Sequence, residues 1–586
     1  MELRKISPGL TVSPQITVTD MGILASHGFK GIINVRPDSE EDGQPSSADI
    51  EKAAREFGLD YKHIPIVPGK MTDADVVAFA AARADMLGPI LSYCRTGTRA
   101  ATLWALSKAD QLSTDAILST AKDAGYDLSS KAAEIDARRA SKETRAASQA
   151  PSLAPSQPHV YDVVIVGGGA GGLAAAASLL KRRPGLDITV IEPRDMHYYQ
   201  PGWTLVGGGV FSRDQTKRPM AKVMPKGVHW TRAAVAAFQP ERNTVVLESG
   251  AEVQYRCLVV SPGLKLDWDQ VEGLRETLGQ NGVTSNYQFD LAPYTWDLVK
   301  SLRGGKALFT QPPMPIKCAG APQKAMYLAC DHWARSGRLK DIDVEFHTAG
   351  AVLFGVQDYV PELMTYVEKY NATLCLQENL VKIDGSRKVA TFEVTDKDGN
   401  KSRVERAFDM IHVCPPQGPL DFMRGTPIVN EAGWVDVHSE TLQHTRYGNI
   451  FGLGDGCSAP NAKTAAAVRK QAPVVAHNVI AVLESKDTGA LYEGYGSCPL
   501  TVERGKVVLA EFGYGGVLQP TFPKWLINGT KASGLAWLLK EKLMPALYFD
   551  LMLKGHEWLA SPKVISHAPL HHEAMDACDF VDGQKK

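Results

Sequence analysis

Short apolar runs alternate with helical stretches along most of the chain. Two β-rich runs, residues 31–35 and 89–94, lie near the N-terminus, and buried-strand runs recur at 163–166 and 188–191. From residue 160 onward the strand and helix patterns are joined by Gly-rich turns, which is typical of α/β enzymes with parallel sheets. We therefore predict an α/β fold class.

Composition changes mark the boundaries between regions. The stretch 138–158 is rich in Ala, Ser, Arg and Pro without an apolar period, which predicts a linker after an N-terminal unit, residues 1–137. Residues 511–586 crowd large apolar side chains between scattered charges, and Pro545 is expected to divide them into two short helices. Such helices suit a membrane interface, a helical cap or a dimer contact.

Overall composition excludes several classes of protein. A chain of 586 residues predicts three or four structural units, and its net charge of −1 gives no reason to expect nucleic-acid binding. Its nine cysteines are odd in number and widely spaced, so we expect most to be reduced and any bridge to be catalytic. The N-terminus lacks a signal-peptide pattern, and no apolar run reaches the ~18 residues of a spanning helix.

A glycine fingerprint follows the apolar run 163–166. Gly167 is placed to make the tight turn, Gly169 to admit a pyrophosphate, and Gly172 to let helix pack on strand. The pyrophosphate would lie at the helix N-terminus, where free N–H groups bind anions. Glu192 ends the next strand and is placed to bind the adenosine ribose. These residues predict a dinucleotide site.

A second element favours FAD over NAD. Residues 449–456 resemble a strand and turn of flavoproteins with two dinucleotide domains, in which an Asp binds the ribityl chain, and Asp455 matches that Asp. Lys463 and Thr464 then begin a helix that, in such proteins, faces the pyrimidine end of the flavin. We assign FAD as the cofactor, and we predict no metal site.

A second glycine fingerprint, which users of NAD(P)H carry, is missing. The expected strand is residues 306–310, but the segment 311–322 after it contains adjacent prolines and Cys318. Close approach of a nicotinamide dinucleotide to this turn is therefore not expected, and electrons must come from another donor.

Several motifs resemble the mitochondrial-type sulfide:quinone oxidoreductases. The resemblance covers about 159–560 and is carried by residues 197–201, 203–207, 317–324, 433–437, 440–444 and 463–468. It implies bound FAD, two redox cysteines and a quinone acceptor. By position the first cysteine is Cys318 and the second is Cys457. The family places the second cysteine directly after the Asp, whereas Gly456 intervenes here, so Cys330, Cys414 and Cys257 remain alternatives.

The resemblance also implies the chemistry. HS⁻ would attack the oxidised cysteine pair and form a persulfide, and the electrons would pass through FAD to a membrane quinone. Glutathione, sulfite or another small nucleophile would accept the sulfane sulfur. We expect peripheral association with the cytoplasmic face of the inner membrane, and the chain could form a homo-oligomer.

The N-terminal unit carries its own nucleophile. Cys94 ends an apolar strand and is followed by a loop with Arg95 and Arg99 before a helical run, an arrangement that should lower the pKa of the thiol. The loop resembles those of tyrosine phosphatases and rhodaneses. Four residues between Cys94 and Arg99 fit the rhodanese pattern better, so we favour sulfur transfer. Phosphatase activity and an inactive binding module remain alternatives.

These features predict a domain order, and competing functions stay open. The predicted parts are a phosphatase- or rhodanese-like domain (1–137), a linker (138–158) and a discontinuous FAD domain (159–300 with 431–510). A second Rossmann-like domain without the NAD fingerprint (301–430) and a helical membrane-association region (511–586) complete the chain. The alternatives are a flavocytochrome-type sulfide dehydrogenase, a membrane NADH dehydrogenase, and a non-catalytic flavin or persulfide sensor.

Overall fold

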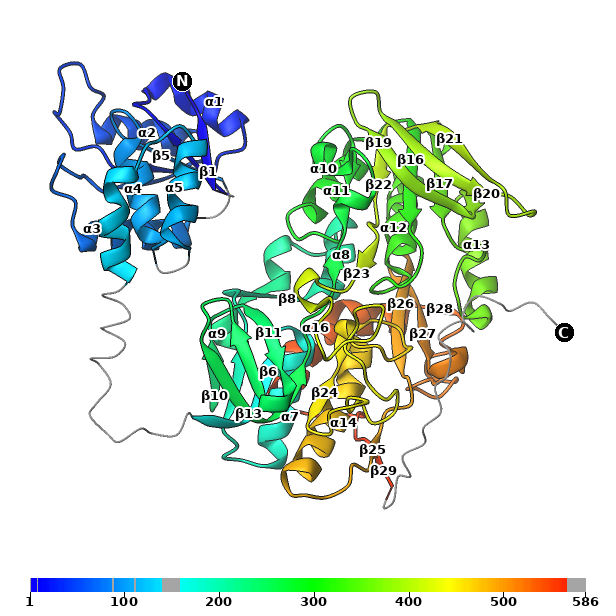
Figure 1. Cartoon of the computed structure of the whole chain (residues 1–586). Coiled ribbons are helices and arrows are strands. Elements are labelled where there is room, and N and C mark those ends of the chain that lie inside the picture. The colour runs from blue at the N-terminus through cyan, green and yellow to red at the C-terminus, as the bar shows by residue number, and fades with distance from the viewer. Residues whose placement is uncertain (1, 8, 87–88, 110–111, 140–158, 566–586) are drawn as a thin grey trace. The chain divides into compact units, whose positions relative to one another are not determined.

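The computed structural model describes residues 2–7, 9–86, 89–109, 112–139 and 159–565 (Figure 1). The chain forms two compact units, Met1–Gln157 and Pro158–Lys586. Residues 140–158 of the predicted linker lie outside the described residues.

The N-terminal unit is a five-stranded sheet flanked by helices. Its strand order is β1-β2-β5-β3-β4, and β2, β5, β3 and β4 are parallel while β1 is antiparallel to β2. β5 ends directly before Cys94, and α4 begins four residues later, so a short loop joins a buried strand to a helix. The elements are β1 (Arg4–Ser7), β2 (Leu10–Ser13), α1 (Met21–Ser26), β3 (Gly31–Asn34), α2 (Ser47–Glu56), β4 (Asp60–His63), α3 (Asp73–Asp85), β5 (Ile90–Tyr93), α4 (Thr98–Ser107) and α5 (Thr114–Asp123).

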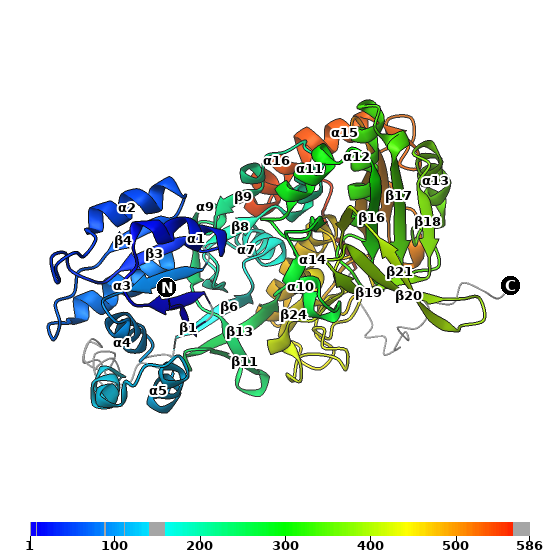
Figure 2. The same cartoon turned by 90° about the horizontal axis from the view of Figure 1, so that it is seen from above.

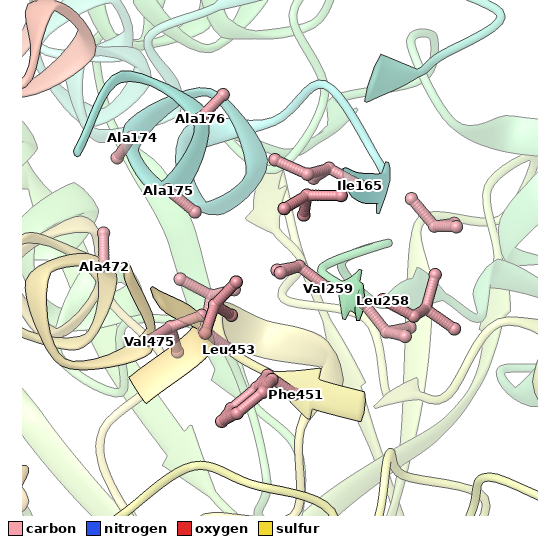
Figure 3. Packing of buried hydrophobic residues seen from close by; sticks show 14 of the residues in the cluster. Ile165, Ala174, Ala175, Ala176, Leu258, Val259, Phe451, Leu453, Ala472 and Val475 are labelled. Atoms are coloured by element: carbon pink, nitrogen blue, oxygen red, sulfur yellow. The ribbon is translucent and has the colours of Figure 1, made fainter. Parts of the chain in front are cut away.

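The first Rossmann domain contains a seven-stranded sheet. Its strand order is β10-β7-β6-β13-β12-β11, and β24 also pairs with β13. Alanines on α7 and α14 face each other and the sheet, and their small side chains let the two helices pack closely (Figure 3). The main elements are β6 (Val160–Val166), α7 (Ala170–Arg182), β7 (Ile188–Ile191), β10 (Val228–Thr231), β11 (Val235–Gln239), β12 (Thr244–Leu247), β13 (Glu252–Val260), β24 (Ile450–Gly452) and α14 (Ala465–Leu483).

The second Rossmann domain is a parallel sheet ordered β15-β22-β16-β17-β18. Antiparallel strands β19, β20 and β21 lie beside it (Figure 2). β15 pairs with β22, so this sheet begins before residue 301, where the sequence placed the boundary. The elements are β15 (Val283–Thr284), α11 (Ala292–Ser301), β16 (Gly305–Gln311), α12 (Ala321–Arg335), β17 (Ile342–Thr348), α13 (Val360–Lys369), β18 (Thr373–Leu376), β19 (Glu378–Asp384), β20 (Val389–Thr395), β21 (Lys401–Ala407) and β22 (Met410–His412).

The C-terminal part of the second unit begins with a small antiparallel sheet and continues as a helical segment. The sheet contains β26 (Gly496–Glu503), β27 (Lys506–Phe512) and β28 (Ala532–Ser533). The helical segment runs through α15 (Gly534–Leu538), η12 (Leu539–Leu543), α16 (Met544–Ala546), η13 (Leu547–Leu551) and η14 (Met552–Lys554).

Pro545 does not divide this segment as predicted. The residues on either side keep right-handed helical dihedral angles, and Pro545 lies in the first turn of α16, between the two π-helical turns η12 and η13. The wider π turns on either side accommodate its ring, so the helical path continues through Pro545. Among the described residues, none of the helices is long and apolar enough to cross a membrane.

Candidate active site

A cavity of about 600 Å³ lies where the two Rossmann domains and the C-terminal helical segment meet. One wall is the glycine turn after β6, and another is the loop that carries Asp455. Cys318 and Lys324 line it from the second Rossmann domain, and Leu539 to Met552 contribute several apolar side chains. Of the predicted cofactor-binding residues, Gly167, Gly169, Glu192, Asp455, Lys463 and Thr464 line this cavity.

The glycine turn fits a dinucleotide. A Cβ at Gly172 would lie 1.9 Å from the carbonyl oxygen of Gly167, so only glycine lets the helix approach the turn this closely. Gly169, at the N-cap of α7, has no atom within 4 Å of its Cβ position, which leaves open space at the helix N-terminus. Glu192 accepts a hydrogen bond from Gly168 N–H at 2.9 Å, which fixes its carboxylate beside the turn.

The second predicted cofactor element is built from β24 and α14. Burial raises the pKa of Asp455, and the nearby ammonium of Lys463 opposes that shift. Lys463 donates to the carbonyl oxygens of Asp455 at 2.8 Å and Cys457 at 3.1 Å, and it stacks on Trp434. Thr464 caps α14 by accepting from Ala467 N–H. The loop and the helix N-terminus are thus held at the cavity.

Cys318 lies in the loop between β16 and α12, where a nicotinamide fingerprint would otherwise stand. Its backbone is left-handed, with φ of 52°, and its N–H donates to the carbonyl oxygen of Lys463 at 2.9 Å. This bond ties the second Rossmann domain to the first. The carbonyl of Cys318 accepts from Ala321 N–H, so the residue lies directly before the N-terminus of α12.

A buried lysine contacts the Cys318 thiol. The Nζ atom of Lys324 lies 3.0 Å from the Sγ atom, and Lys324 is buried in the first turns of α12. A hydrogen bond from Cys498 and the Lys324 ammonium hold the pKa of Cys318 well below its usual value, although burial opposes this. Burial alone would lower the pKa of Lys324, but the charge of Cys318 raises it above its usual value. The two groups form an ammonium–thiolate pair.

Cys498 is the second sulfur at this site. Its Sγ atom lies 3.4 Å from that of Cys318, across 180 positions of sequence. The hydrogen bond to Cys318 and burial raise the pKa of Cys498 well above its usual value. Lys540, from the C-terminal helical segment, donates to the carbonyl oxygen of Pro499 at 2.8 Å.

Cys457 lies elsewhere, which corrects the expected pairing with Cys318. Its side chain is 0% exposed in the core of the first Rossmann domain, and its thiol donates to the carbonyl oxygen of Gly454 at 3.2 Å. Burial raises its pKa. Because Gly456 follows Asp455, the cysteine is turned away from the cavity into the core. The alternatives Cys257, Cys330 and Cys414 are also buried, and burial raises the pKa of each thiol.

In the N-terminal unit, Cys94 lies in the predicted loop. Gly97 N–H points at its Sγ atom at 3.1 Å, and Gly97 has a left-handed φ of 87°. Arg99 donates to Glu40 at 2.8 Å and to the carbonyl oxygen of Ile66 at 2.7 Å, whereas Arg95 is exposed. Burial opposes ionisation of Glu40, but hydrogen bonds from Arg99 and Arg36 hold its pKa below the usual value.

The sequence reasoning missed Cys498, Lys324 and Lys540. Cys498 is 2% exposed in a strand, a pattern that ordinary core cysteines share. The position of Lys324 in the sequence could have indicated a nearby anion. A lysine near the start of a helix is unfavourable beside the positive end of the helix dipole unless a negative group lies next to it. The chain position of Lys540 gave no signal of its contact with β26.

Two family models match separate parts of the chain. The family described as "Beta-lactamase hydrolase-like protein, phosphatase-like domain" matches residues 2–111, and "Pyridine nucleotide-disulphide oxidoreductase" matches residues 161–293. The beta-lactamase hydrolase-like protein of Agrobacterium fabrum is 38% identical over 130 residues, which is 22% of this chain and 30% of that protein.

The larger unit also has relatives. The mitochondrial sulfide:quinone oxidoreductase of Dictyostelium discoideum is 42% identical over 372 residues, covering 63% of this chain and 80% of that protein. The solved sulfide:quinone oxidoreductase of Aquifex aeolicus matches the fold with a TM-score of 0.56 at 20% identity, covering 67% of this chain and 92% of that one.

The fold and site define an FAD-dependent flavoprotein with two Rossmann-type domains. Within that class, the chain belongs to the sulfide:quinone oxidoreductase family and carries a phosphatase-like domain at its N-terminus. The predicted fold class, the family resemblance and FAD as cofactor are therefore confirmed.

The Lys324 contact predicts how the reactivity of Cys318 depends on pH. A thiol is alkylated as its thiolate, which exists above its pKa, so wild-type Cys318 in the reduced protein should react rapidly below the usual thiol pKa. Lys324→Met removes the ammonium, and the inflection should move to higher pH. Lys324→Arg should keep most of the wild-type profile. Iodoacetamide rates for Cys318, followed by mass spectrometry, measure this, and three identical profiles would contradict the pairing.

Proposed function

We propose that this protein oxidises hydrogen sulfide at Cys318 and passes the electrons through FAD to a membrane quinone. The observation that carries the proposal is the 3.0 Å contact between Lys324 Nζ and Cys318 Sγ, on the wall of the cavity that the glycine turn and Asp455 also line. Membership of the sulfide:quinone oxidoreductase family supports the same reaction.

The residues around Cys318 suit attack on a disulfide. HS⁻ attacks a disulfide between Cys318 and a second cysteine, which yields one persulfide and one thiolate. Lys324 and the N-terminus of α12 stabilise the thiolate on Cys318, so that sulfur is the better leaving group. When bound, FAD supplies the two-electron acceptor that links sulfur oxidation to quinone reduction.

The C-terminal helical segment suits a membrane-bound acceptor. Leu535, Leu538 and Leu543 are each about half exposed, and we call these three side chains the apolar face of the segment; Trp525 is 84% exposed. Leu539, Met544 and other side chains of the same segment line the cavity. We place this apolar face in the lipid headgroup region of the inner membrane, at its cytoplasmic side, so that quinone can enter the cavity. Phe522 also lines the cavity and is a candidate aromatic contact for the quinone ring.

The N-terminal domain then handles sulfane sulfur, with Cys94 as the carrier. Arg99, which a phosphatase would use to bind a phosphate dianion, is already paired with Glu40 in this structure. A loop whose arginine is neutralised favours a terminal sulfur over a phosphate. Glutathione, sulfite or another small nucleophile would be the final acceptor of the sulfur.

Anaerobic sulfide titration tests the central reaction. Sulfide should bleach the flavin absorbance of the wild-type protein, and a quinone analogue should restore it. Cys318→Ala should keep its FAD but lose sulfide-dependent quinone reduction by at least ~100-fold, because the reacting sulfur is removed. Bleaching by NADH, with no response to sulfide, would instead support a dehydrogenase. Sulfide reduction of the flavin without turnover would support the sensor.

The membrane proposal predicts a loss of vesicle binding in the double variant Leu538→Glu, Leu543→Glu. Two carboxylates on the exposed apolar face should lower the fraction that sediments with lipid vesicles by ~10-fold or more. Val77→Glu, a similarly exposed apolar position in the N-terminal unit, is the matched control. Unchanged sedimentation of the double variant would rule out this face as the contact.

Sulfur transfer is tested with Cys94→Ser. Transfer of sulfur from thiosulfate to cyanide should fall by at least ~100-fold because the oxygen cannot carry the sulfane sulfur. Quinone reduction by sulfide with sulfite as acceptor should remain, and Cys318→Ala should show the reverse pattern. Hydrolysis of p-nitrophenyl phosphate that depends on Cys94, without sulfur transfer, would favour the phosphatase alternative.

A further inference from the structure

We propose that Glu345, His347 and Cys375 form a zinc-binding site in the second Rossmann domain. Glu345 and His347 lie two positions apart on β17, and Cys375 on β18 pairs with His347. Alternate residues of one strand, and residues directly opposite on its neighbour, point to the same face of a sheet. A carboxylate oxygen, a ring nitrogen and the Sγ atom therefore meet, and all three lie within 4.8 Å of one another.

These three atoms are a ligand set that suits Zn²⁺. Zinc binds thiolate sulfur, imidazole nitrogen and carboxylate oxygen at ~2.0–2.3 Å in a tetrahedral arrangement. Such bonds put neighbouring ligand atoms about 3.3–3.7 Å apart, so side-chain movements of about 1 Å would close the group around one ion. Mg²⁺ and Ca²⁺ prefer sites made of oxygen alone, so the sulfur selects against them.

His347 is oriented as a metal-bound histidine usually is. Its Nδ1 atom lies 2.8 Å from a carboxylate oxygen of Glu378, and its Nε2 atom lies 3.0 Å from one of Glu345. When Nδ1–H donates to Glu378, the Nε2 lone pair faces an oxygen acceptor, and either a second ring proton or a metal ion must lie between them. A carboxylate that accepts the other N–H is the usual outer partner of a zinc-bound histidine.

The neighbouring side chains hold the ligands in place. Lys306 contacts one carboxylate oxygen of Glu345 at 2.8 Å, which leaves the other oxygen to face His347. The Phe392 ring stacks on the His347 ring at 4.0 Å between centroids, so an ion would approach in the plane of the imidazole. Glu345 is 7% exposed and His347 is 0% exposed, whereas Cys375 is half-buried on β18, an edge strand. An ion, with a water as its fourth ligand, could enter at that edge.

The charges around the ligands match one divalent cation. With Cys375 as a thiolate, four negative groups face two cations, and one Zn²⁺ balances the two negative charges that remain. A buried site is strongly destabilised by charge that is left unbalanced. The carboxylates are Asp343, Glu345 and Glu378, and the cations are Lys306 and Arg406.

A bound ion would join two layers of the domain. β17 and β18 belong to the parallel sheet, whereas Glu378 begins β19 and Phe392 lies on β20 of the antiparallel strands beside it (Figure 2). We therefore assign the site a structural role that does not depend on the oxidation of sulfide. The sequence analysis predicted no metal site because these ligands follow no spacing motif and meet only when the strands pair.

Zinc binding is measured directly on the full-length, FAD-containing protein. After treatment with a chelator, Zn²⁺ is titrated in competition with a chromophoric chelator, and bound metal is counted by mass spectrometry. The wild-type protein should hold one Zn²⁺ per chain at this site, and X-ray absorption at the zinc edge should show one sulfur neighbour. Cys375→Ala should weaken binding by at least ~100-fold, and Glu378→Gln, which keeps the size of the side chain, by ~10–100-fold. Zinc should also raise the Tm of the wild-type protein but not that of Cys375→Ala.

Two controls separate this site from other residues that could bind zinc. Cys318→Ala removes the thiol at the cavity, and the double variant His571→Ala, His572→Ala removes adjacent histidines near the C-terminus. Both should bind zinc at this site as tightly as the wild-type protein does. A wild-type protein that holds no zinc would overturn the proposal and assign these side chains to an ion-pair network with a protonated imidazole. A folded Cys375→Ala protein with unchanged zinc affinity would overturn it as well.

Discussion

The buried contact between the Lys324 ammonium and the Cys318 thiolate is the interaction on which the site depends. Either charge alone would be strongly disfavoured in this position, because burial removes the water that stabilises it. The partial positive charge at the N-terminus of α12 favours the thiolate but disfavours the lysine. The charged form of Lys324 near the start of the helix is therefore favoured when a negative sulfur lies beside it. The pair is a functional feature more than a source of stability.

The surroundings of this pair bring distant parts of the chain together. The Cys318 N–H donates a hydrogen bond to the backbone carbonyl of Lys463 in the first Rossmann domain, and Cys498 lies on β26. Lys540 joins β26 to the helical segment, which also carries the exposed Leu535, Leu538 and Leu543. The same segment also lines the cavity through Tyr548, which hydrogen-bonds His197 beside the glycine turn. A displacement of this segment at a membrane surface would therefore move both the strand that carries Cys498 and the residues beside the glycine turn.

Local patterns predicted much of the fold and part of the site. The glycines of the turn after β6, Glu192 and Asp455 were found because a dinucleotide imposes a fixed spacing within one βαβ unit. Cys318 could be singled out from the sequence because it stands where a fingerprint was expected. Its contact with Cys498 could not be predicted, because that contact depends on how a C-terminal strand packs against the second Rossmann domain, and no spacing rule links positions so far apart.

Two errors share one physical origin. Cys457 was assigned from its distance to Lys463, but a single residue decides whether a side chain in a tight turn faces the cavity or the core. Pro545 was expected to break a helix, but the flanking π turns absorb it. In both cases the local sequence rule was sound, and the direction of one turn of backbone determined the outcome.

The two nucleophilic cysteines of this chain show opposite uses of a nearby cation. At Cys318 the lysine has no carboxylate partner among its described contacts, so its whole charge acts on the sulfur. At Cys94 the arginine of the loop is already paired with Glu40, so less of its charge is available to a ligand. A strong unshared cation suits a sulfur that must leave as a thiolate. A neutralised one suits a sulfur that must accept, hold and pass on a small cargo without binding dianions tightly, and this difference supports assigning electron transfer to one half of the chain and sulfur transfer to the other.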